Sequence, residues 1–183
     1  SKVRIAIVGC GTISQLNVPG YIEHPDCEIV ALCDPVSERA ESKAREWGIS
    51  PRICTDYGEI IADSEIDAVE LLTPTYLHAD QIIKGLQGGK HISCQKPLAT
   101  SMEEAARISE VVTKSDRIFR VTENFLYYPP ILKAKELVMF GEIGEPSLVR
   151  IRTIRGGMTK TRIPVESDAY VWRRDPELNP GGM

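Results

Sequence analysis

The sequence has few of the features that would place a protein in a membrane, on nucleic acid or in an oxidising compartment. No apolar run approaches the roughly 18 residues that a membrane-spanning helix needs, and the first residues show no secretory signal. Lysine and arginine number 22 against 26 aspartates and glutamates, a net charge of −4 at pH 7. This balance argues against nucleic acid or an anionic membrane as the main partner.

Cysteine is present, but in a pattern that argues against disulfide or metal sites. The five cysteines are odd in number and form no C-x-x-C pair. Cys33 and Cys94 lie in apolar, strand-like runs, where a free thiol packs as a small hydrophobic group. Cys10 precedes an expected helix, a place that favours thiolate, although we expect it to be a filler too. We predict no metal site and a reducing cytoplasm as the compartment.

Repeats and low-complexity segments are also missing, so the chain is expected to form ordinary globular domains. It is 42% hydrophobic and 26% charged, the usual balance for such proteins. A length of 183 residues is enough for one full domain and part of another.

The most informative stretch is the first 34 residues. An apolar run, 3–8, leads into Gly9-Cys10-Gly11-Thr12-Ile13-Ser14, and a second apolar run, 28–33, ends on Asp34. A strand, a glycine-rich turn, a helix and a second strand closed by an acid form half of a mononucleotide-binding unit. A purely structural turn is the alternative, because many tight turns carry G-x-G.

Each part of this unit has a physical role in binding a dinucleotide. Gly9 allows the tight turn, and Gly11 lets the backbone approach a pyrophosphate, which the helix N-terminus then attracts. Ser14 stands where Gly or Ala is usual; it is still small, and its hydroxyl can bond a carbonyl one turn earlier. Asp34 would accept hydrogen bonds from the ribose hydroxyls, which predicts NAD as the cofactor. NADP remains possible, because Arg39 could hold its extra phosphate.

Strands and helices alternate after this unit. Further strands are expected at 52–55, 68–72, 91–94 and 118–121, with helices between them. The alternation predicts an α/β fold with a doubly wound parallel (Rossmann) sheet and helices on both faces.

The helix ends are predicted from local signals. Pro19 and Gly20 are expected to kink or break the first helix. Ser37 and Thr75 are each expected to cap a helix, and Ser101 with Glu104 to form a capping box.

The pattern changes after about residue 123. Pro129-Pro130 is expected to open a helix that Gly141 stops, and residues 147–155 alternate like a half-exposed strand. A strand without partner strands is not a finished domain. We therefore predict a Rossmann domain at 1–123 and, at 124–183, the beginning of an α+β open antiparallel sheet domain, apparently truncated.

Several motifs, in this order and spacing, resemble the glucose–fructose oxidoreductase/inositol dehydrogenase (Gfo/Idh/MocA) family across the whole length. They are Gly9-Cys10-Gly11, Asp34, Thr73-Pro74-Thr75-Tyr76-Leu77-His78, Gln95-Lys96-Pro97-Leu98-Ala99, Glu123-Asn124-Phe125, Gly141-Glu142-Ile143-Gly144 and Trp172-Arg173…Gly181-Gly182. The resemblance implies a Rossmann domain followed by an open antiparallel sheet domain, and NAD(P)-dependent oxidation or reduction of sugars, polyols and related compounds.

The resemblance also implies roles for individual residues. Lys96 is similar to the family's catalytic lysine, which bonds the reacting oxygen and stabilises its negative charge; a solvated surface lysine is the alternative. Gln95 replaces the usual Glu but keeps hydrogen bonding to a ribose. The Lys–Pro bond in these proteins is commonly cis. The remaining implied contacts to the cofactor are Gly9, Gly11, Thr12, Ile13, Asp34, Thr73, Pro74, Tyr76, His78, Asn124, Trp172 and Arg173.

Some of these implied roles have alternatives. A structural role for His78 is as plausible as a cofactor contact, and Trp172-Arg173 could instead be an exposed loop. In relatives the Gly-Gly segment continues into an acid/base histidine, whereas this sequence stops at Met183.

Two functions of different classes follow. The first is an NAD(P)-dependent oxidoreductase acting on a small sugar- or polyol-like substrate, or a family variant that eliminates a glycosidic bond with transient use of NAD. The second is a dinucleotide-binding or sensing module without chemistry. The resemblance implies a homodimer or homotetramer.

Overall fold

The computed structural model describes residues 2–152, 172 and 175–179. The chain divides into two compact units, the first formed by Ser1–Thr122 with Val165–Met183 and the second by Glu123–Pro164.

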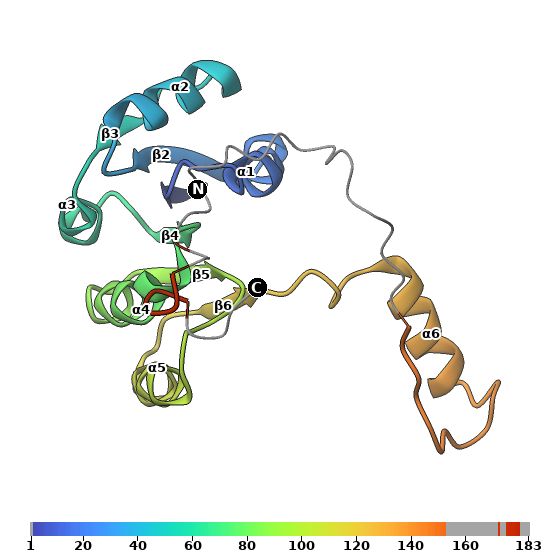
Figure 1. Ribbon diagram of the computed structural model, residues 1–183. Coiled ribbons are helices and arrows are strands. Elements are labelled where there is room, and N and C mark those ends of the chain that lie inside the picture. The colour runs from blue at the N-terminus through green and yellow to red at the C-terminus, as the bar shows by residue number, and fades with distance from the viewer. Residues whose placement is uncertain (1, 153–171, 173–174, 180–183) are drawn as a thin grey trace. The chain divides into compact units, whose positions relative to one another are not determined.

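The first unit is built on a sheet in which six strands pair in parallel within the described residues (Figure 1). The strands are β1 Val3–Val8, β2 Cys27–Cys33, β3 Arg52–Cys54, β4 Ala68–Leu71, β5 His91–Gln95 and β6 Phe119–Thr122. Their order across the sheet is β3-β2-β1-β4-β5-β6. The direction of winding therefore reverses between β1 and β4, as in a doubly wound fold.

Helices cover both faces of this sheet. They are α1 Ser14–Glu23, α2 Ser37–Trp47, α3 Tyr57–Ala62, α4 His78–Gln87 and α5 Met102–Lys114. One buried cluster joins Ile7 and Leu32 to Val18 of α1 and Ala40 of α2. Another joins alternate strand residues to Ile60 of α3, Ile82 of α4 and Ile108 of α5. The predicted doubly wound parallel sheet is confirmed.

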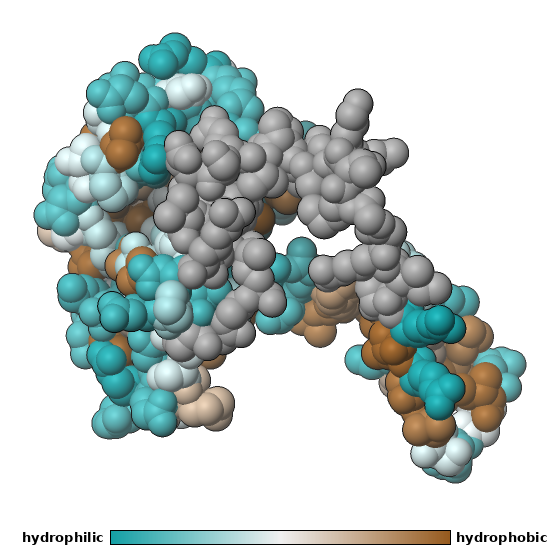
Figure 2. All heavy atoms as spheres, viewed as in Figure 1, coloured by the Kyte–Doolittle hydropathy of each residue, from teal (hydrophilic) through white to brown (hydrophobic). Residues whose placement is uncertain are grey.

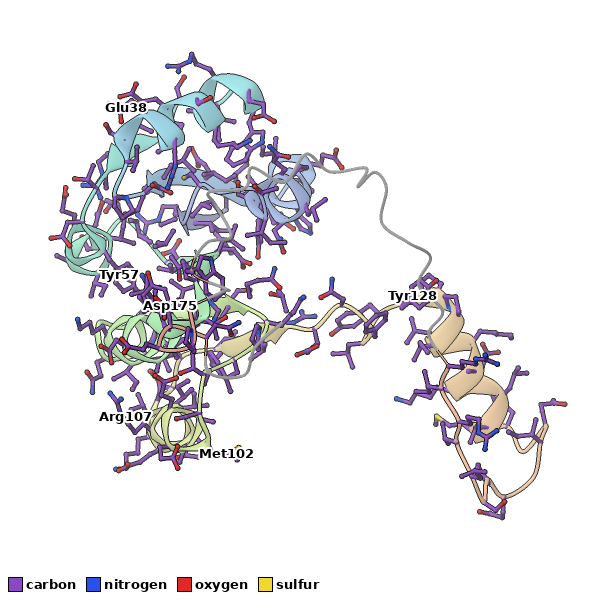
Figure 3. All side chains as sticks on the ribbon, in the orientation of Figure 1. Glu38, Tyr57, Met102, Arg107, Tyr128 and Asp175 are labelled. Atoms are coloured by element: carbon purple, nitrogen blue, oxygen red, sulfur yellow. The ribbon has the colours of Figure 1, made fainter. Side chains whose placement is uncertain are left out.

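The outer sides of the helices are polar. Glu38 on α2 and Arg107 on α5 point away from the sheet (Figure 3). The guanidinium of Arg107 lies 3.2 Å from the Asp80 carboxylate, so this ion pair links the outer surfaces of α5 and α4. In the part of the chain that the structure describes, no helix is long and apolar enough to cross a membrane.

Two predicted side-chain caps were wrong, and so was the early break that was one of two expected outcomes for the first helix. Helix α1 continues through Pro19 to Glu23, so the expected early break does not occur; the packing of Val18, which is fully buried, outweighs the missing amide. Neither Ser37 nor Thr75 caps a helix through its side chain. Ser37 is already helical, and Thr75 opens a short 3₁₀ turn, Thr75–Leu77, that precedes α4.

The capping box at α5 is confirmed in part. The Ser101 hydroxyl accepts a hydrogen bond from the Glu104 amide at 3.2 Å. The Glu104 carboxylate bonds the amide and hydroxyl of Thr100, at 2.8 and 2.7 Å, where a standard box would use the amide of the cap residue itself. The loop between β5 and α5 is therefore fixed at its helical end.

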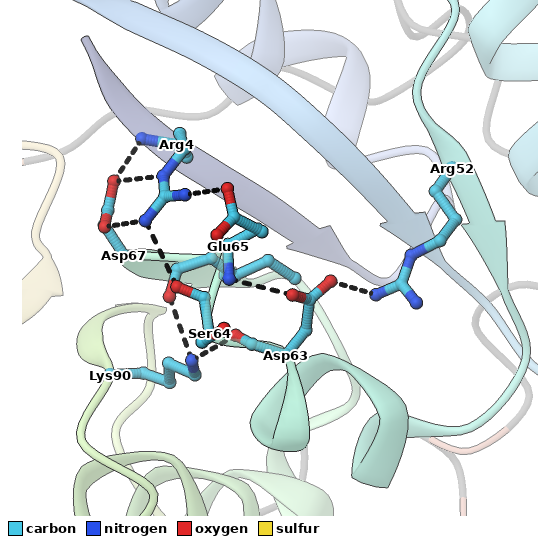
Figure 4. Close-up of polar contacts among 8 residues, drawn as sticks. Arg4, Arg52, Asp63, Ser64, Glu65, Asp67 and Lys90 are labelled. Atoms are coloured by element: carbon cyan, nitrogen blue, oxygen red, sulfur yellow. Dashed lines mark hydrogen bonds and ion pairs between the residues drawn. The ribbon is translucent and has the colours of Figure 1, made fainter. Parts of the chain in front are cut away.

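A network of charged residues ties together the amino ends of the strands (Figure 4). The Arg4 guanidinium bonds both carboxylate oxygens of Asp67, at 2.8 and 3.1 Å, and also contacts Glu65. The ammonium of Lys90, 5% exposed, donates to the carbonyls of Asp63 and Ile66. These contacts join the starts of β1, β4 and β5 at the edge opposite the one where ligands bind in such folds.

The second unit contains one helix in its described part, α6 Pro129–Met139. Gly141, at φ 75°, follows its end as predicted, because a left-handed residue there stops the helix. Apolar side chains gather on α6 (Figure 2). Met139 at its end and Phe140 directly after it are 74% and 75% exposed. Residues 147–152 form no strand, contrary to the prediction, because within the described residues no second strand pairs with them; residues 153–155 lie outside the description.

Candidate functional site

The predicted site residues of the first unit gather at the carboxyl ends of β1, β2, β4 and β5. The Gly9 amide donates to the Cys33 carbonyl at 2.8 Å, and the Leu72 amide donates to the Val8 carbonyl at 2.8 Å. These bonds hold the loops after β1, β2 and β4 side by side at the point where the winding reverses. Open α/β sheets bind their ligands in the crevice at this point.

The glycine turn after β1 uses its two glycines differently. Gly9 has φ 97°, and a Cβ there would lie 2.8 Å from the backbone of Leu72, so this position admits only glycine. Apart from its two chain neighbours, a Cβ added at Gly11 would meet no atom of the described residues within 4 Å. The space beside Gly11 is therefore open to a ligand, as the sequence predicted for a backbone that approaches a pyrophosphate.

The backbone amides that follow point to an anion site. The Ser14 hydroxyl, fully buried, donates to the Gly11 carbonyl at 2.6 Å, the back-bond that the sequence predicted. Among the described residues, no acceptor is bonded to the amides of Gly11, Thr12 or Ile13. Unpaired amides at the start of α1 attract negative charge, which suits a phosphate group.

Asp34, directly after β2, is 5% exposed and already holds the turn in place. One carboxylate oxygen accepts from the Cys10 amide and the other from the Val36 amide, both at 3.0 Å. The Arg39 guanidinium lies 3.8 Å from the second oxygen. A carboxylate has about four lone-pair sites, so Asp34 keeps capacity for ribose hydroxyls.

Cys10 is a buried filler rather than a reactive thiol. It is 3% exposed, and burial together with the charge of Asp34 raises the pKa of Cys10 to about 12. The helix N-terminus is thus outweighed by desolvation. All five cysteines are unpaired.

The loop after β4 is braced by two side chains of α4. The Thr73 hydroxyl bonds the amide oxygen of Gln81 at 2.5 Å. His78, 1% exposed, has Nε2 2.9 Å from the Thr73 carbonyl and Nδ1 2.9 Å from the Pro97 carbonyl. Burial lowers the pKa of His78, and the two carbonyls oppose that shift. A ring so enclosed favours the structural alternative for His78.

The loop after β5 carries the predicted catalytic lysine. Lys96 is exposed, and its bond to Pro97 is cis, as the resemblance implied. Gln95 is 8% exposed; its oxygen accepts from the Lys96 amide at 2.9 Å, and its nitrogen donates to Asn17 of α1 at 3.4 Å. Asn17 could not be predicted as a site residue, because it lies 78 positions from Gln95 in the sequence.

Of the remaining predicted residues, some lie at this edge of the sheet and others do not. Pro74 precedes the 3₁₀ turn, and the half-buried ring of Tyr76 meets that of Trp172 edge to face, with centroids 6.2 Å apart. This contact joins Trp172 to the loop after β4. Asn124 is exposed and belongs to the second unit, and Arg173 lies outside the described residues.

Comparison with known proteins agrees with this geometry. Residues 3–123 match the family model described as an oxidoreductase family with an NAD-binding Rossmann fold. The chain belongs to the Gfo/Idh/MocA family.

Two relatives illustrate this membership. The chain is 37% identical over 146 residues to scyllo-inositol 2-dehydrogenase (NAD(+)) of Bacillus subtilis, covering 79% of this chain and 42% of that protein. A crystal structure of a putative myo-inositol dehydrogenase from Sinorhizobium meliloti matches with a TM-score of 0.72 and 29% identity, covering 79% of this chain and 43% of that one.

A third relative was solved with a cofactor. The 3-ketoreductase KijD10 from Actinomadura kijaniata, in complex with NADP and TDP-benzene, matches with a TM-score of 0.71 and 26% identity. The match covers 79% of this chain and 44% of KijD10. The chain thus spans less than half the length of these relatives.

Proposed function

We propose that this chain is the dinucleotide-binding part of an NAD(P)-dependent oxidoreductase that transfers hydride between a nicotinamide cofactor and a sugar, polyol or related hydroxy compound. The observation that carries the proposal is the grouping at one sheet edge of open amides at Gly11–Ile13, the Asp34 carboxylate and the exposed Lys96. The first two suit the pyrophosphate and ribose of a dinucleotide.

The other predicted residues support binding along the same edge. Thr73, Pro74 and Tyr76 lie on the loop after β4, beside the loop of Gln95 and Lys96. Thr12 and Ile13 would contribute amides to the pyrophosphate, and Trp172, which meets Tyr76 edge to face, would cover the cofactor. We assign Asn124 and Arg173 to the nicotinamide or substrate end on the family resemblance alone.

Lys96 would act on the substrate oxygen. When bound, the nicotinamide ring supplies the hydride acceptor or donor. The ammonium of Lys96 donates a hydrogen bond to the reacting oxygen, and this bond strengthens as negative charge develops there. The turn is positioned for this by the Gln95 oxygen, which holds the Lys96 amide at 2.9 Å.

The substrate class rests on the relatives. Two of them are named as inositol dehydrogenases, which act on a polyol, and one is named as a 3-ketoreductase. We also propose a domain boundary after residue 123, where the family model ends. The full-length protein is proposed to be an oligomer. A reducing cytoplasm is proposed as its compartment, because the five cysteines are unpaired.

The experiment combines binding and turnover. Calorimetry with NAD should show binding, and the full-length protein should form NADH from a panel of inositols and sugars. Binding without turnover of any panel member would favour the sensing module. A product formed without net NADH would favour elimination with transient use of NAD. Absence of NAD and NADP binding would contradict the proposal.

A further inference from the structure

His78 joins the two loops that flank the proposed nicotinamide site. It is the first residue of α4, which follows the 3₁₀ turn after β4, and its ring is 1% exposed. Its Nε2 faces the carbonyl of Thr73 in its own loop, and its Nδ1 faces the carbonyl of Pro97 in the next loop, each at 2.9 Å. Pro97 is the neighbour of Lys96 in sequence, so the ring contacts the turn that carries the lysine.

The two contacts make different demands on the ring. A carbonyl oxygen only accepts hydrogen bonds, and a neutral imidazole has one N–H. A neutral His78 therefore bonds one of the two loops, and a protonated His78 bonds both. Burial favours the neutral ring, whereas the carbonyls and the Glu104 carboxylate of α5 favour the cation. The loop of residues 72–77 carries no charged side chain.

The other contacts of this loop fix its ends. Glu104 holds Thr100, next to α5, and the Gln95 side chain holds the Lys96 amide at the end of β5. The Pro97 carbonyl lies between these two anchors and is bonded from α4, an element outside the loop.

We propose that His78 is a positioning residue, whose Nδ1 bond to the Pro97 carbonyl holds the turn so that the Lys96 ammonium reaches the substrate oxygen. The proposal rests on the proposed function, because it presumes that Lys96 is catalytic. His78 itself does not touch cofactor or substrate; both of its ring nitrogens face protein carbonyls.

Amide isosteres of histidine separate the two contacts. In His78→Asn the side-chain amide nitrogen takes the place of Nδ1 and still reaches Pro97, whereas in His78→Gln it takes the place of Nε2 and reaches Thr73. Displacing a catalytic group slightly is expensive in rate, so His78→Phe and His78→Gln should lower kcat about tenfold or more, and His78→Asn less than about threefold. The affinity for NAD should change less than about twofold in all three, since the loss is confined to the chemical step.

A matched control is His91→Phe. His91 also makes one ring bond, accepting from the Ile118 amide at 2.9 Å, but it lies at the amino end of β5, away from the site. The His91→Phe substitution should leave kcat unchanged, even if it lowers thermal stability. Equal kcat in His78→Asn and His78→Gln, or unchanged kcat in His78→Phe, would overturn the proposal. Retained activity in Lys96→Met would instead contradict the catalytic role of Lys96, so the two failures are distinguishable.

NMR of the unaltered full-length protein provides a second test, which stands even where a variant does not fold. The amide signals of Lys96 and Leu98 should move with the same pH midpoint as the His78 ring nitrogens, because a protonated ring donates a stronger, charge-assisted bond from Nδ1 to the Pro97 carbonyl between them. The position of that midpoint should lie below the ordinary histidine pKa, as burial dictates. Amide chemical shifts of Lys96 and Leu98 that do not change over the pH range of the His78 titration would contradict the proposal.

Discussion

At the scale of single residues, Asp34 combines a structural role with the ribose contact that we propose for it. Its place after β2 predicted contact with the ribose, and the structure adds that the same carboxylate holds the amides of Cys10 and Val36. We therefore propose that one side chain sets both the cofactor choice and the shape of the phosphate turn. Hydrogen bonds from backbone amides to a side-chain carboxylate cannot be predicted from the sequence pattern.

This double role makes the choice of variant important for testing cofactor preference. Repulsion between Asp34 and the phosphate of NADP, about 1–4 kcal/mol at 4 Å, predicts at least about a fivefold preference for NAD. Asp34→Asn should erode the preference while keeping an acceptor for the turn. Asp34→Ser should also weaken NAD itself, because it frees both amides.

Calorimetry with both cofactors checks this prediction. Asp26→Asn, an exposed aspartate before β2, should leave the ratio of affinities unchanged. Arg39, 3.8 Å from Asp34, could favour NADP, and tighter binding of NADP than of NAD by the unaltered protein would contradict the prediction.

Other site residues were predictable because parallel strands bring their carboxyl ends to one edge. Gly9, Gly11, Thr73 and Lys96 each follow an apolar run, and each lies at that edge. The contacts between these loops were not predictable. Asn17 meets Gln95, and His78 meets Pro97, only because the sheet order places β1 and β5 on either side of β4.

At the scale of elements, the alternation of strands and helices was sufficient to predict the first unit. Local signals were weaker where packing competes with them: α1 continues through Pro19, and Thr75 begins a 3₁₀ turn. The alternating pattern of residues 147–152 produced no strand, because a strand needs a partner for its backbone groups.

The charged network at the amino edge leads to a prediction about stability. Arg4 holds the pKa of Asp67 at about 2, below its ordinary value of 3.8. A lowered carboxyl pKa stabilises the fold above the unfolded pKa, and the contribution disappears as the pH falls through about 2. Asp67 is partly exposed, so Asp67→Asn should cost about 1 kcal/mol of unfolding free energy near neutral pH.

Denaturant unfolding at neutral pH and near pH 2 measures this contribution. The difference between Asp67→Asn and the unaltered protein should shrink at the lower pH. Asp116→Asn, which removes an exposed pair between neighbours in sequence, should cost less. A destabilisation by Asp67→Asn that does not change with pH would contradict the ionic origin.

At the scale of the whole molecule, the second unit exposes many apolar side chains. Leu148, Val149 and Ile151 are each more than three-quarters exposed in the described residues. Apolar surfaces of this kind mark contacts with other protein segments or subunits. We expect the full-length protein to use this segment in forming a dimer or tetramer.

Light scattering at micromolar concentration tests that expectation. Ile151→Lys should weaken association by about tenfold or more, since burying an unpaired charge is costly. Met102→Lys, at an equally exposed site on α5, should have no effect. A strictly monomeric unaltered protein would contradict the prediction.

The most direct test of the central claim is the turnover of Lys96→Met in the full-length protein. The substitution keeps an apolar stem and removes only the ammonium. Loss of a donor to a developing oxyanion typically lowers kcat about 10²–10³-fold, and NAD affinity should stay within about twofold. Lys84→Met, an exposed lysine on α4, is the control and should be fully active. A Lys96→Met protein that keeps most of its turnover would contradict the proposed mechanism.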